Sequence, residues 1–121
     1  MTDPVKIALI GCGGMGARHG LAYAELARAQ VRDVQLVAVC DEDGARAGLI
    51  AANVSTAAGR EVRVYRRLDE VLASGDIDAI DVVLPTWLHH QVAVKGIKAG
   101  KHVLVEKPLA ITIRAADQVV A

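Results

Sequence analysis

A glycine-rich loop between an apolar run and an alanine-rich stretch constrains the fold of this chain most strongly. Gly11, Gly13 and Gly16 have the spacing G-x-G-x-x-G and directly follow the apolar run 5–10. In a turn from a strand into a helix, the first glycine permits a tight turn, the second lets a pyrophosphate approach the backbone, and the third allows close packing of helix on strand. The N-terminus of the helix would offer N–H groups and a positive dipole end to phosphate. The loop alone is equally compatible with a plain strand-to-helix connection.

An acid at the end of the next apolar run supplies a second signal. The run 34–40 is directly followed by Asp41, which lies 25 residues after Gly16. In dinucleotide-binding folds, an acid about 20 residues beyond the loop binds the adenosine ribose. Asp41 could equally be the N-cap of the following helix, and one carboxylate can serve both purposes. Together the loop and the acid predict a dinucleotide site.

Apolar runs alternate with helical stretches along the whole chain, a pattern typical of repeated βαβ units. We expect strands at 5–10, 34–40, 62–65, 79–84 and 102–106, and helices near 15–30, 43–57, 68–74, 88–99 and 112–121. The third strand is short and charged, which favours an edge position. The predicted fold is therefore α/β, a single domain with a doubly wound parallel sheet of the Rossmann type in three αβα layers.

The composition excludes several classes of partner. The chain has 121 residues, enough for one domain, and its 14 basic and 14 acidic residues leave no net charge. A chain without a basic patch is not expected to bind nucleic acid or an anionic membrane. No apolar stretch reaches the length of a membrane span, and no basic leader precedes one, so we expect a cytoplasmic protein.

The last helix, with Thr112 as its N-cap, lacks a terminating residue and suggests a longer protein, although a natural terminal helix is the alternative.

The cysteines and histidines do not form a pattern typical of metal sites. Cys12 and Cys40 are expected at the ends of neighbouring strands, where such residues are most often reduced and buried; a disulfide or redox pair is the less favoured alternative. His89 and His90 are adjacent, but neighbours on a helix diverge and no third ligand is evident. We predict no metal.

The segment after the fourth strand is expected at the ligand-binding edge of the sheet. Pro85 ends the strand, and Thr86 could cap the next helix. His89 falls on the inward face of that helix, one turn before Ala93. A neutral His89 that fixes the loop by a hydrogen bond is the favoured role, because the positive end of a helix disfavours an imidazolium.

The segment after the fifth strand carries the candidate catalytic group. The strand ends in Glu106 and Lys107, which could form an ordinary solvent-exposed ion pair. Alternatively, Lys107 is partly desolvated beside the reactive ring of a cofactor, where burial and the positive charge of an oxidised nicotinamide would both disfavour the ammonium form. Such a lysine could hydrogen-bond a substrate hydroxyl or relay its proton.

With these residues in view, the chain resembles the N-terminal domain of the glucose-fructose oxidoreductase, inositol dehydrogenase and rhizopine-catabolism (Gfo/Idh/MocA) family. The resemblance covers the whole chain, from the loop at 7–16 to the segment 100–110, and Glu106-Lys107-Pro108 after Gly-Lys-His-Val is its most specific part. Leu84 departs from it, because the family usually has threonine before the proline. The resemblance implies a cis Lys107–Pro108 bond and a catalytic role for Lys107. It implies cofactor contacts from Gly11, Gly13, Gly14, Met15, Gly16, Asp41, Pro85, Thr86, His89, Glu106, Lys107 and Pro108.

The function that this resemblance implies is hydride transfer between a nicotinamide and a sugar, polyol or related hydroxy compound. The family's second domain, which supplies most of the substrate pocket, the usual catalytic histidine and the subunit interface of a homo-oligomer, is not in the chain. We therefore expect these residues to bind cofactor without completing turnover. Asp41, Glu42 and Asp43 would repel a 2′-phosphate, which favours NAD over NADP, although Arg46 could soften that preference. The alternatives are an NAD-binding regulatory or interaction module and, disfavoured by Glu106-Lys107-Pro108, a methyltransferase.

Overall fold

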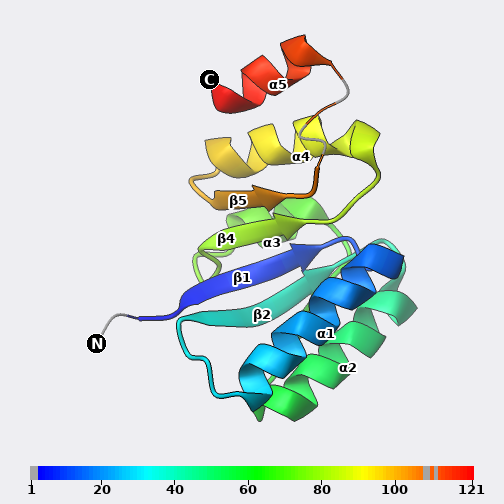
Figure 1. The fold of residues 1–121 in the computed structure, drawn as a ribbon, viewed down its shortest axis with the longest axis vertical. Helices are drawn as coiled ribbons and strands as arrows, with labels where there is room; N and C mark the ends of the chain where they lie inside the picture. Colours follow the sequence, from blue (N-terminus) through cyan, green and yellow to red (C-terminus); the bar gives the residue numbers. More distant parts are fainter. Residues whose placement is uncertain (1–2, 108–109, 111) are drawn as a thin grey trace.

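The computed structural model describes residues 3–107, 110 and 112–121, and these contain five parallel strands in one sheet of order β3-β2-β1-β4-β5 (Figure 1). The strands are β1 (Val5–Ile10), β2 (Val34–Cys40), β3 (Arg63–Tyr65), β4 (Ala79–Val82) and β5 (His102–Val105). β1 is central, and the chain moves outward to β2 and β3 on one side, then to β4 and β5 on the other. The predicted α/β doubly wound sheet is confirmed, with β3 at an edge as its charge suggested.

Helices follow the strands in strict alternation. They are α1 (Gly14–Arg28), α2 (Gly44–Ala58), α3 (Leu68–Ala73), α4 (Thr86–Lys98) and α5 (Ile113–Val120). The predicted elements are all present, but β4 ends two residues before the predicted end and α4 begins two residues before the predicted start. Thr112 is the N-cap of α5 as predicted, since its side chain accepts the N–H of Ala115. The capping role predicted for Thr86 is wrong, because Pro85 occupies the N-cap position and no side chain caps α4.

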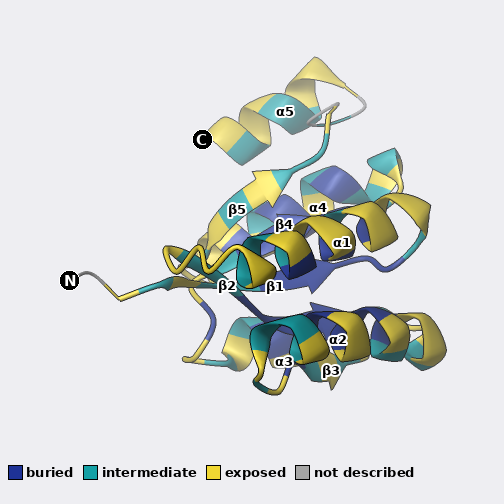
Figure 2. Cartoon of the chain, turned by 60° about the horizontal axis from the view of Figure 1, so that its bottom comes forward, coloured by how far each residue is buried: buried dark blue, intermediate teal, exposed yellow. Residues whose placement is uncertain are grey.

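Two apolar clusters, one on each face of the sheet, make the three layers. α1 and α2 contribute Ala24, Ile50 and Val54 to a cluster with Leu9 and Leu36. A second cluster joins side chains of α3 and α4 to the other face of the same strands, among them Val71, Val92, Ile10, Ile80 and Val82. Figure 2 shows the buried residues along the central strands and on parts of the helices, whereas α5 has none. β-Branched and leucine side chains in consecutive strand positions are what a sheet covered on both faces requires.

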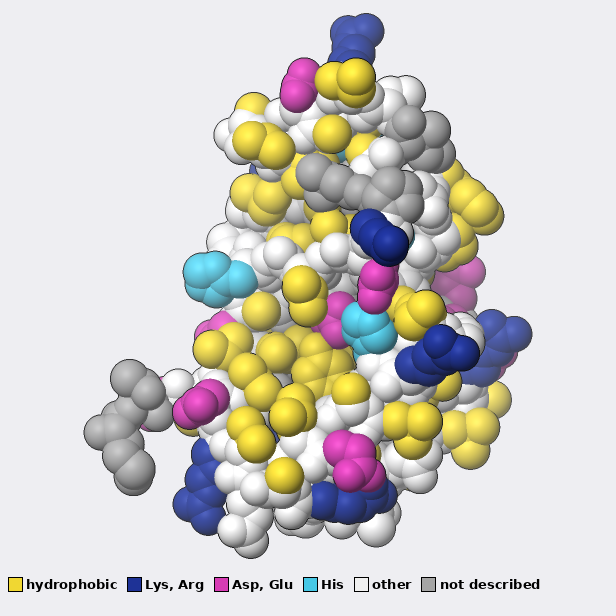
Figure 3. Space-filling model, in the orientation of Figure 1, with side chains coloured by type: hydrophobic (Ala, Val, Ile, Leu, Met, Phe, Trp, Pro, Cys, Tyr) yellow, Lys and Arg dark blue, Asp and Glu magenta, His cyan; other side chains and the backbone are white. Residues whose placement is uncertain are grey.

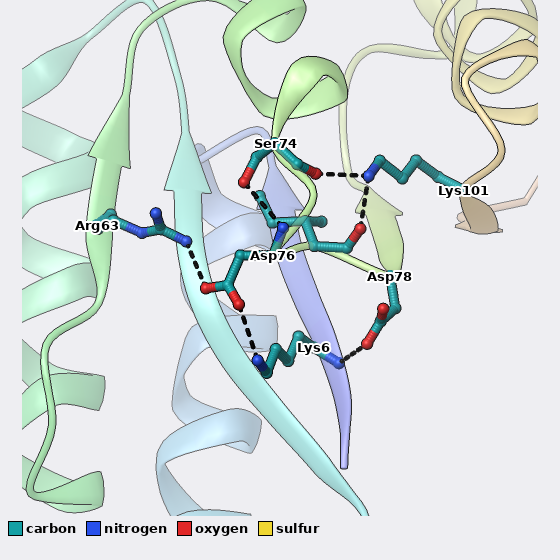
Figure 4. Close-up of polar contacts among 7 residues, drawn as sticks. Lys6, Arg63, Ser74, Asp76, Asp78 and Lys101 are labelled. Atoms are coloured by element: carbon teal, nitrogen blue, oxygen red, sulfur yellow. Dashed lines mark hydrogen bonds and ion pairs between the residues drawn. The ribbon is translucent and has the colours of Figure 1, made fainter. Parts of the chain in front are cut away.

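Ionic contacts hold the amino-terminal edge of the sheet, opposite the glycine loop (Figure 4). The Lys6 ammonium lies 2.8 Å from Asp76, which also accepts from Arg63 at 3.0 Å, and the backbone N–H of Lys6 donates to Asp78. The Lys101 ammonium donates to the carbonyl oxygens of Ser74 and Ile77, at 2.7 and 2.6 Å. Lys101 belongs to the Gly-Lys-His-Val motif, so this motif residue acts at the edge away from the glycine loop.

Candidate functional site

The glycine loop follows β1 and packs tightly against the neighbouring backbone. Gly11 has φ +102°, a left-handed conformation that side-chain-bearing residues rarely adopt. A Cβ at Gly11 would collide with the carbonyl oxygen of Val83, and one at Gly16 would collide with the carbonyl oxygen of Gly11. These two glycines are therefore required by the fold itself, because they let the first turn of α1 sit directly on the ends of β1 and β4.

The outer side of the loop is open. A Cβ at Gly13 or Gly14 would meet no heavy atom within 4 Å, and Met15 is 47% exposed. Gly13 is the N-cap residue of α1, and no side chain caps this helix. An open backbone surface at an uncapped helix N-terminus fits a pyrophosphate, whose oxygens would accept from the N–H groups there. The loop therefore passes the steric test for the cofactor that its spacing predicts.

Asp41 lies beside this loop at the end of β2. Its Oδ2 accepts the backbone N–H of Cys12 at 2.7 Å, and its Oδ1 accepts the N–H of Asp43 at 2.8 Å. The structure thus brings the predicted ribose ligand against the predicted phosphate loop. The alternative role of Asp41 as the helix cap is wrong: Asp43 is the N-cap of α2, and its side chain accepts from Ala45 and Arg46.

A pocket of about 500 Å³ opens beside Asp41 at the carboxyl-terminal edge of the sheet. Its apolar wall includes Leu84, Pro85 and Leu88 from the segment after β4. Its polar wall includes Asp41 and Arg66, and the Arg66 guanidinium donates to the carbonyl oxygen of Glu42 at 3.0 and 3.2 Å. An apolar slot next to a carboxylate has the character expected for an adenosine. Arg66 was not singled out from the sequence, since nothing local distinguishes it from other surface arginines.

His89 has the geometry that the sequence predicts. It lies in the first turns of α4, is 2% exposed, and its Nε2 lies 2.8 Å from the carbonyl oxygen of Leu84. This bond holds the segment of Leu84 and Pro85 against the first turns of the helix, which begins at Thr86. The loop-fixing role is therefore confirmed, and contact of these residues with a cofactor stays a prediction.

Glu106 and Lys107 follow β5 at the same edge of the sheet. The backbone N–H of Glu106 donates to the carbonyl oxygen of Val82, which continues the pairing of β5 with β4. Lys107 is exposed among the described residues, and its desolvation beside a bound cofactor stays a prediction. Pro108, and with it the predicted cis bond, lies outside the described residues.

A buried polar cluster, which was not predicted from the sequence, lies beside this segment. Asp81 on β4 is 1% exposed, and its Oδ2 accepts the Tyr23 hydroxyl at 2.7 Å and lies 2.7 Å from His19 Nδ1. His19 Nε2 lies 2.9 Å from Glu106 Oε1. Two signals could have indicated the cluster: a lone carboxylate in an apolar strand, and the i, i+4 spacing of His19 and Tyr23 on one helix face.

The two cysteines are free thiols, and both are buried. Burial, reinforced by the Asp41 carboxylate, raises the pKa of Cys12 to about 12 and that of Cys40 to about 11.

Among the described residues, no three His, Cys, Asp or Glu side chains are grouped so that they could hold a metal ion. In the same residues, no helix combines the length and the apolar character needed to cross a membrane.

The fold, the open glycine loop and the acid at the end of β2 define a dinucleotide-binding Rossmann domain. The chain belongs to the Gfo/Idh/MocA family, described as an oxidoreductase family with an NAD-binding Rossmann fold, whose model matches residues 5–121. The resemblance drawn from the sequence is therefore confirmed.

Three relatives illustrate what the chain is similar to. A dTDP-3,4-didehydro-2,6-dideoxy-alpha-D-glucose 3-reductase from Saccharopolyspora spinosa is 38% identical over 93% of this chain and 31% of that protein. The structure of myo-inositol 2-dehydrogenase from Lactobacillus plantarum is 28% identical, with a TM-score of 0.78 over 97% of this chain and 32% of the other. KijD10, a 3-ketoreductase from Actinomadura kijaniata solved with TDP-benzene and NADP, is 27% identical, with a TM-score of 0.74 over 97% and 34%. The chain thus spans about a third of the length of each.

Proposed function

We propose that the chain is the cofactor-binding part of an NAD-dependent oxidoreductase that acts on a hydroxyl group of a sugar, a polyol or a related compound. The observation that carries this proposal is the bond between Asp41 and the backbone of Cys12, because it sets the acid predicted to bind ribose beside the open loop predicted to receive the pyrophosphate. The sugar reductase and the inositol dehydrogenase among the relatives support the substrate class.

The described residues suggest how the cofactor would be held. The backbone at Gly13, Gly14 and Met15 would receive the pyrophosphate, and Asp41 the adenosine ribose. Leu84 and Pro85 would contribute the apolar wall for the adenine, with the loop kept in place by His89. We propose that NAD is preferred over NADP, because Asp41 would repel a 2′-phosphate, although KijD10 was solved with NADP.

In this proposal the bound nicotinamide supplies the hydride chemistry, and the protein supplies alignment. Lys107, after β5, would hydrogen-bond the substrate hydroxyl and help to move its proton. Since Lys107 is exposed among the described residues, its desolvation would have to come from the cofactor, the substrate or further protein. The relatives extend well beyond the matched region, which supports a second, substrate-binding domain outside these 121 residues.

Two further properties of the complete protein are part of the proposal. Free, buried thiols at Cys12 and Cys40 fit a cytoplasmic location, where cysteines are kept reduced. A homo-oligomer is proposed from the family resemblance, with its subunit interface in the second domain. Size-exclusion chromatography with light scattering on the complete protein would test the assembly.

The test of the proposed function compares Lys107→Ala with the parent in the complete protein, using a panel of sugars and polyols. Lys107→Ala should reduce kcat for NADH formation at least a hundredfold while the Kd for NAD changes less than threefold. Unchanged turnover would contradict the catalytic role of Lys107. Tight NAD binding without NADH formation from any compound would instead favour a regulatory module.

A further inference from the structure

The cluster of His19, Tyr23, Asp81 and Glu106 connects three elements that the cofactor site uses. His19 and Tyr23 come from α1, the helix that follows the glycine loop, while Asp81 comes from β4 and Glu106 from the segment after β5. Figure 3 shows a histidine side chain with acidic side chains next to it on the face between α1 and β5. His19 contacts two of these elements, because its Nδ1 lies beside Asp81 of β4 and its Nε2 lies beside Glu106 after β5.

The number of protons in this cluster follows from its geometry. Both ring nitrogens of His19 lie within 2.9 Å of a carboxylate oxygen. A neutral imidazole has one N–H, so it could donate to only one of these oxygens, and its other nitrogen would face an acceptor. Both contacts are hydrogen bonds only if His19 is an imidazolium or if one carboxyl carries a proton. Either state has one more proton than a neutral histidine between two carboxylates.

The contacts of Asp81 favour the imidazolium. Its Oδ2 accepts the Tyr23 hydroxyl and lies 2.7 Å from His19 Nδ1, and hydrogen bonds to a carboxylate oxygen favour the charged form of that carboxylate. The titratable groups that contact His19 are Asp81 and Glu106. The Tyr23 hydroxyl donates to the same Asp81 oxygen that His19 contacts, and Lys107 follows Glu106 in the sequence. Burial alone would lower the pKa of His19, but the hydrogen bonds and charges of Asp81 and Glu106 outweigh burial and raise it above its ordinary value.

We infer that His19 is a positioning residue: as an imidazolium it ties the Glu106 carboxylate to α1 and thereby fixes the adjacent Lys107 relative to the glycine loop. The expected effect of this connection on turnover rests on the proposed function, because Lys107 needs a defined place beside a nicotinamide only if hydride transfer occurs there. A displacement of about 1 Å in such a group can lower a rate by as much as about a hundredfold. Loss of the proton would leave one of the two carboxylates without a donor and weaken the connection between α1 and Glu106.

The first experiment measures the ring of His19 by ¹⁵N NMR in the chain itself and requires no variant. We expect both ring nitrogens to carry protons at pH 7, and the ring to titrate at a higher pH in the folded chain than in the urea-unfolded chain. The second follows the backbone amide signals of Glu106 and Lys107 in His19→Gln. These signals should shift in His19→Gln and stay in place in the matched control His102→Gln, since His102 is exposed at the other end of β5.

The third experiment connects positioning to turnover in the complete protein. His19→Gln should lower kcat about tenfold and change the Kd for NAD less than threefold, and the kcat of the parent should fall as alkaline pH removes the proton. The inference is overturned if His19 carries a single ring proton at pH 7, or if the Glu106 and Lys107 signals do not respond to His19→Gln. It is equally overturned if kcat is unchanged in that variant. If the parent binds no NAD, the proposed function fails, and the ring and amide measurements still decide whether the His19 connection exists.

Discussion

The carboxylate of Asp41 accepts the backbone N–H of Cys12 at 2.7 Å, so the acid at the end of β2 directly fixes the glycine loop after β1. The same carboxylate accepts the N–H of Asp43 through its other oxygen. Asp41 therefore has a structural role in the folded chain that precedes any contact with a ribose. A substitution there should affect both stability and cofactor binding.

Asp41→Asn should lower the free energy of unfolding by about 1–2 kcal/mol, because an amide can accept only one of the two N–H groups and sets its own NH₂ against the other. The affinity for NAD should fall about tenfold. Urea unfolding and calorimetric titration would measure the two effects. Asp43→Asn is the matched control: asparagine caps helices as well as aspartate does, so stability should be unchanged. An Asp41→Asn protein as stable as the parent would contradict the role of this carboxylate.

Substitutions of two glycines in the loop should have different effects, one on stability and the other on NAD binding. Gly11→Ala should destabilise the chain by several kcal/mol, because the added Cβ collides with Val83 in a backbone conformation that alanine avoids. Gly13→Ala should change stability by less than about 1 kcal/mol and weaken NAD binding at least tenfold, since its Cβ would enter only the open space in front of the loop.

Gly48→Ala is the control for these variants, because Gly48 lies within α2 and its added Cβ would meet no heavy atom within 4 Å. It should raise stability by up to about 1 kcal/mol and leave NAD binding unchanged. Thermal unfolding and calorimetry on the three variants would check the pattern. Equal losses of NAD affinity in Gly13→Ala and Gly48→Ala would count against a pyrophosphate at the loop.

Lys101 should contribute to stability and not to cofactor binding. Lys101→Met removes the ammonium that donates to the Ser74 and Ile77 carbonyls and should cost about 2 kcal/mol, the range for hydrogen bonds to charged groups. Lys98→Met, at an exposed lysine near the end of α4, should change stability by less than about 0.5 kcal/mol. Denaturant midpoints and NAD titrations of both variants test this. A loss of NAD affinity in Lys101→Met would contradict this prediction, because it would indicate that Lys101 acts at the cofactor site and not at the opposite edge of the sheet.

The thiols should be unreactive in the folded chain. With pKa values raised to about 12 for Cys12 and about 11 for Cys40, both remain protonated at pH 8, and the thiolate is the reactive form. A disulfide reagent such as Ellman's reagent should modify neither thiol under native conditions at pH 8 and both in denaturant. Rapid modification of the native chain would show that one thiol is accessible and ionised, contrary to its burial.

The stability of the chain should depend on pH through His19. Because the pKa of His19 is raised on folding, its contribution is fully present below the unfolded value, about 6.5, and is lost as pH rises through the folded value. The free energy of unfolding should therefore decline from pH 6 to pH 9 more steeply in the parent than in His19→Gln. Identical slopes in urea titrations of the two proteins would show that the histidine does not gain affinity for its proton on folding.

The parts of the structure that the sequence predicts well depend on local patterns. The strands and helices follow from apolar runs and their periodicity, and the loop of Gly11, Gly13 and Gly16 with Asp41 follows from spacing within one βαβ unit. The N-cap of α2 is Asp43 instead of Asp41, because two aspartates within three residues are equivalent until the backbone fixes which one precedes the first turn.

The parts that were missed depend on contacts between distant residues. His19 lies 62 residues from Asp81 and 87 from Glu106, so no local pattern connects them. Lys101 was part of a recognised motif, but only the sheet shows that it acts at the opposite edge from the ligand. Lys107 is exposed among the described residues, and its desolvation beside a bound cofactor stays a prediction.

Calorimetric titration of NAD into the chain tests the central claim most directly. The account predicts saturable binding of one NAD per chain, weakened at least tenfold by Gly13→Ala and unaffected by Gly48→Ala. Absence of NAD binding by the folded parent, or equal affinity in Gly13→Ala and the parent, would contradict it.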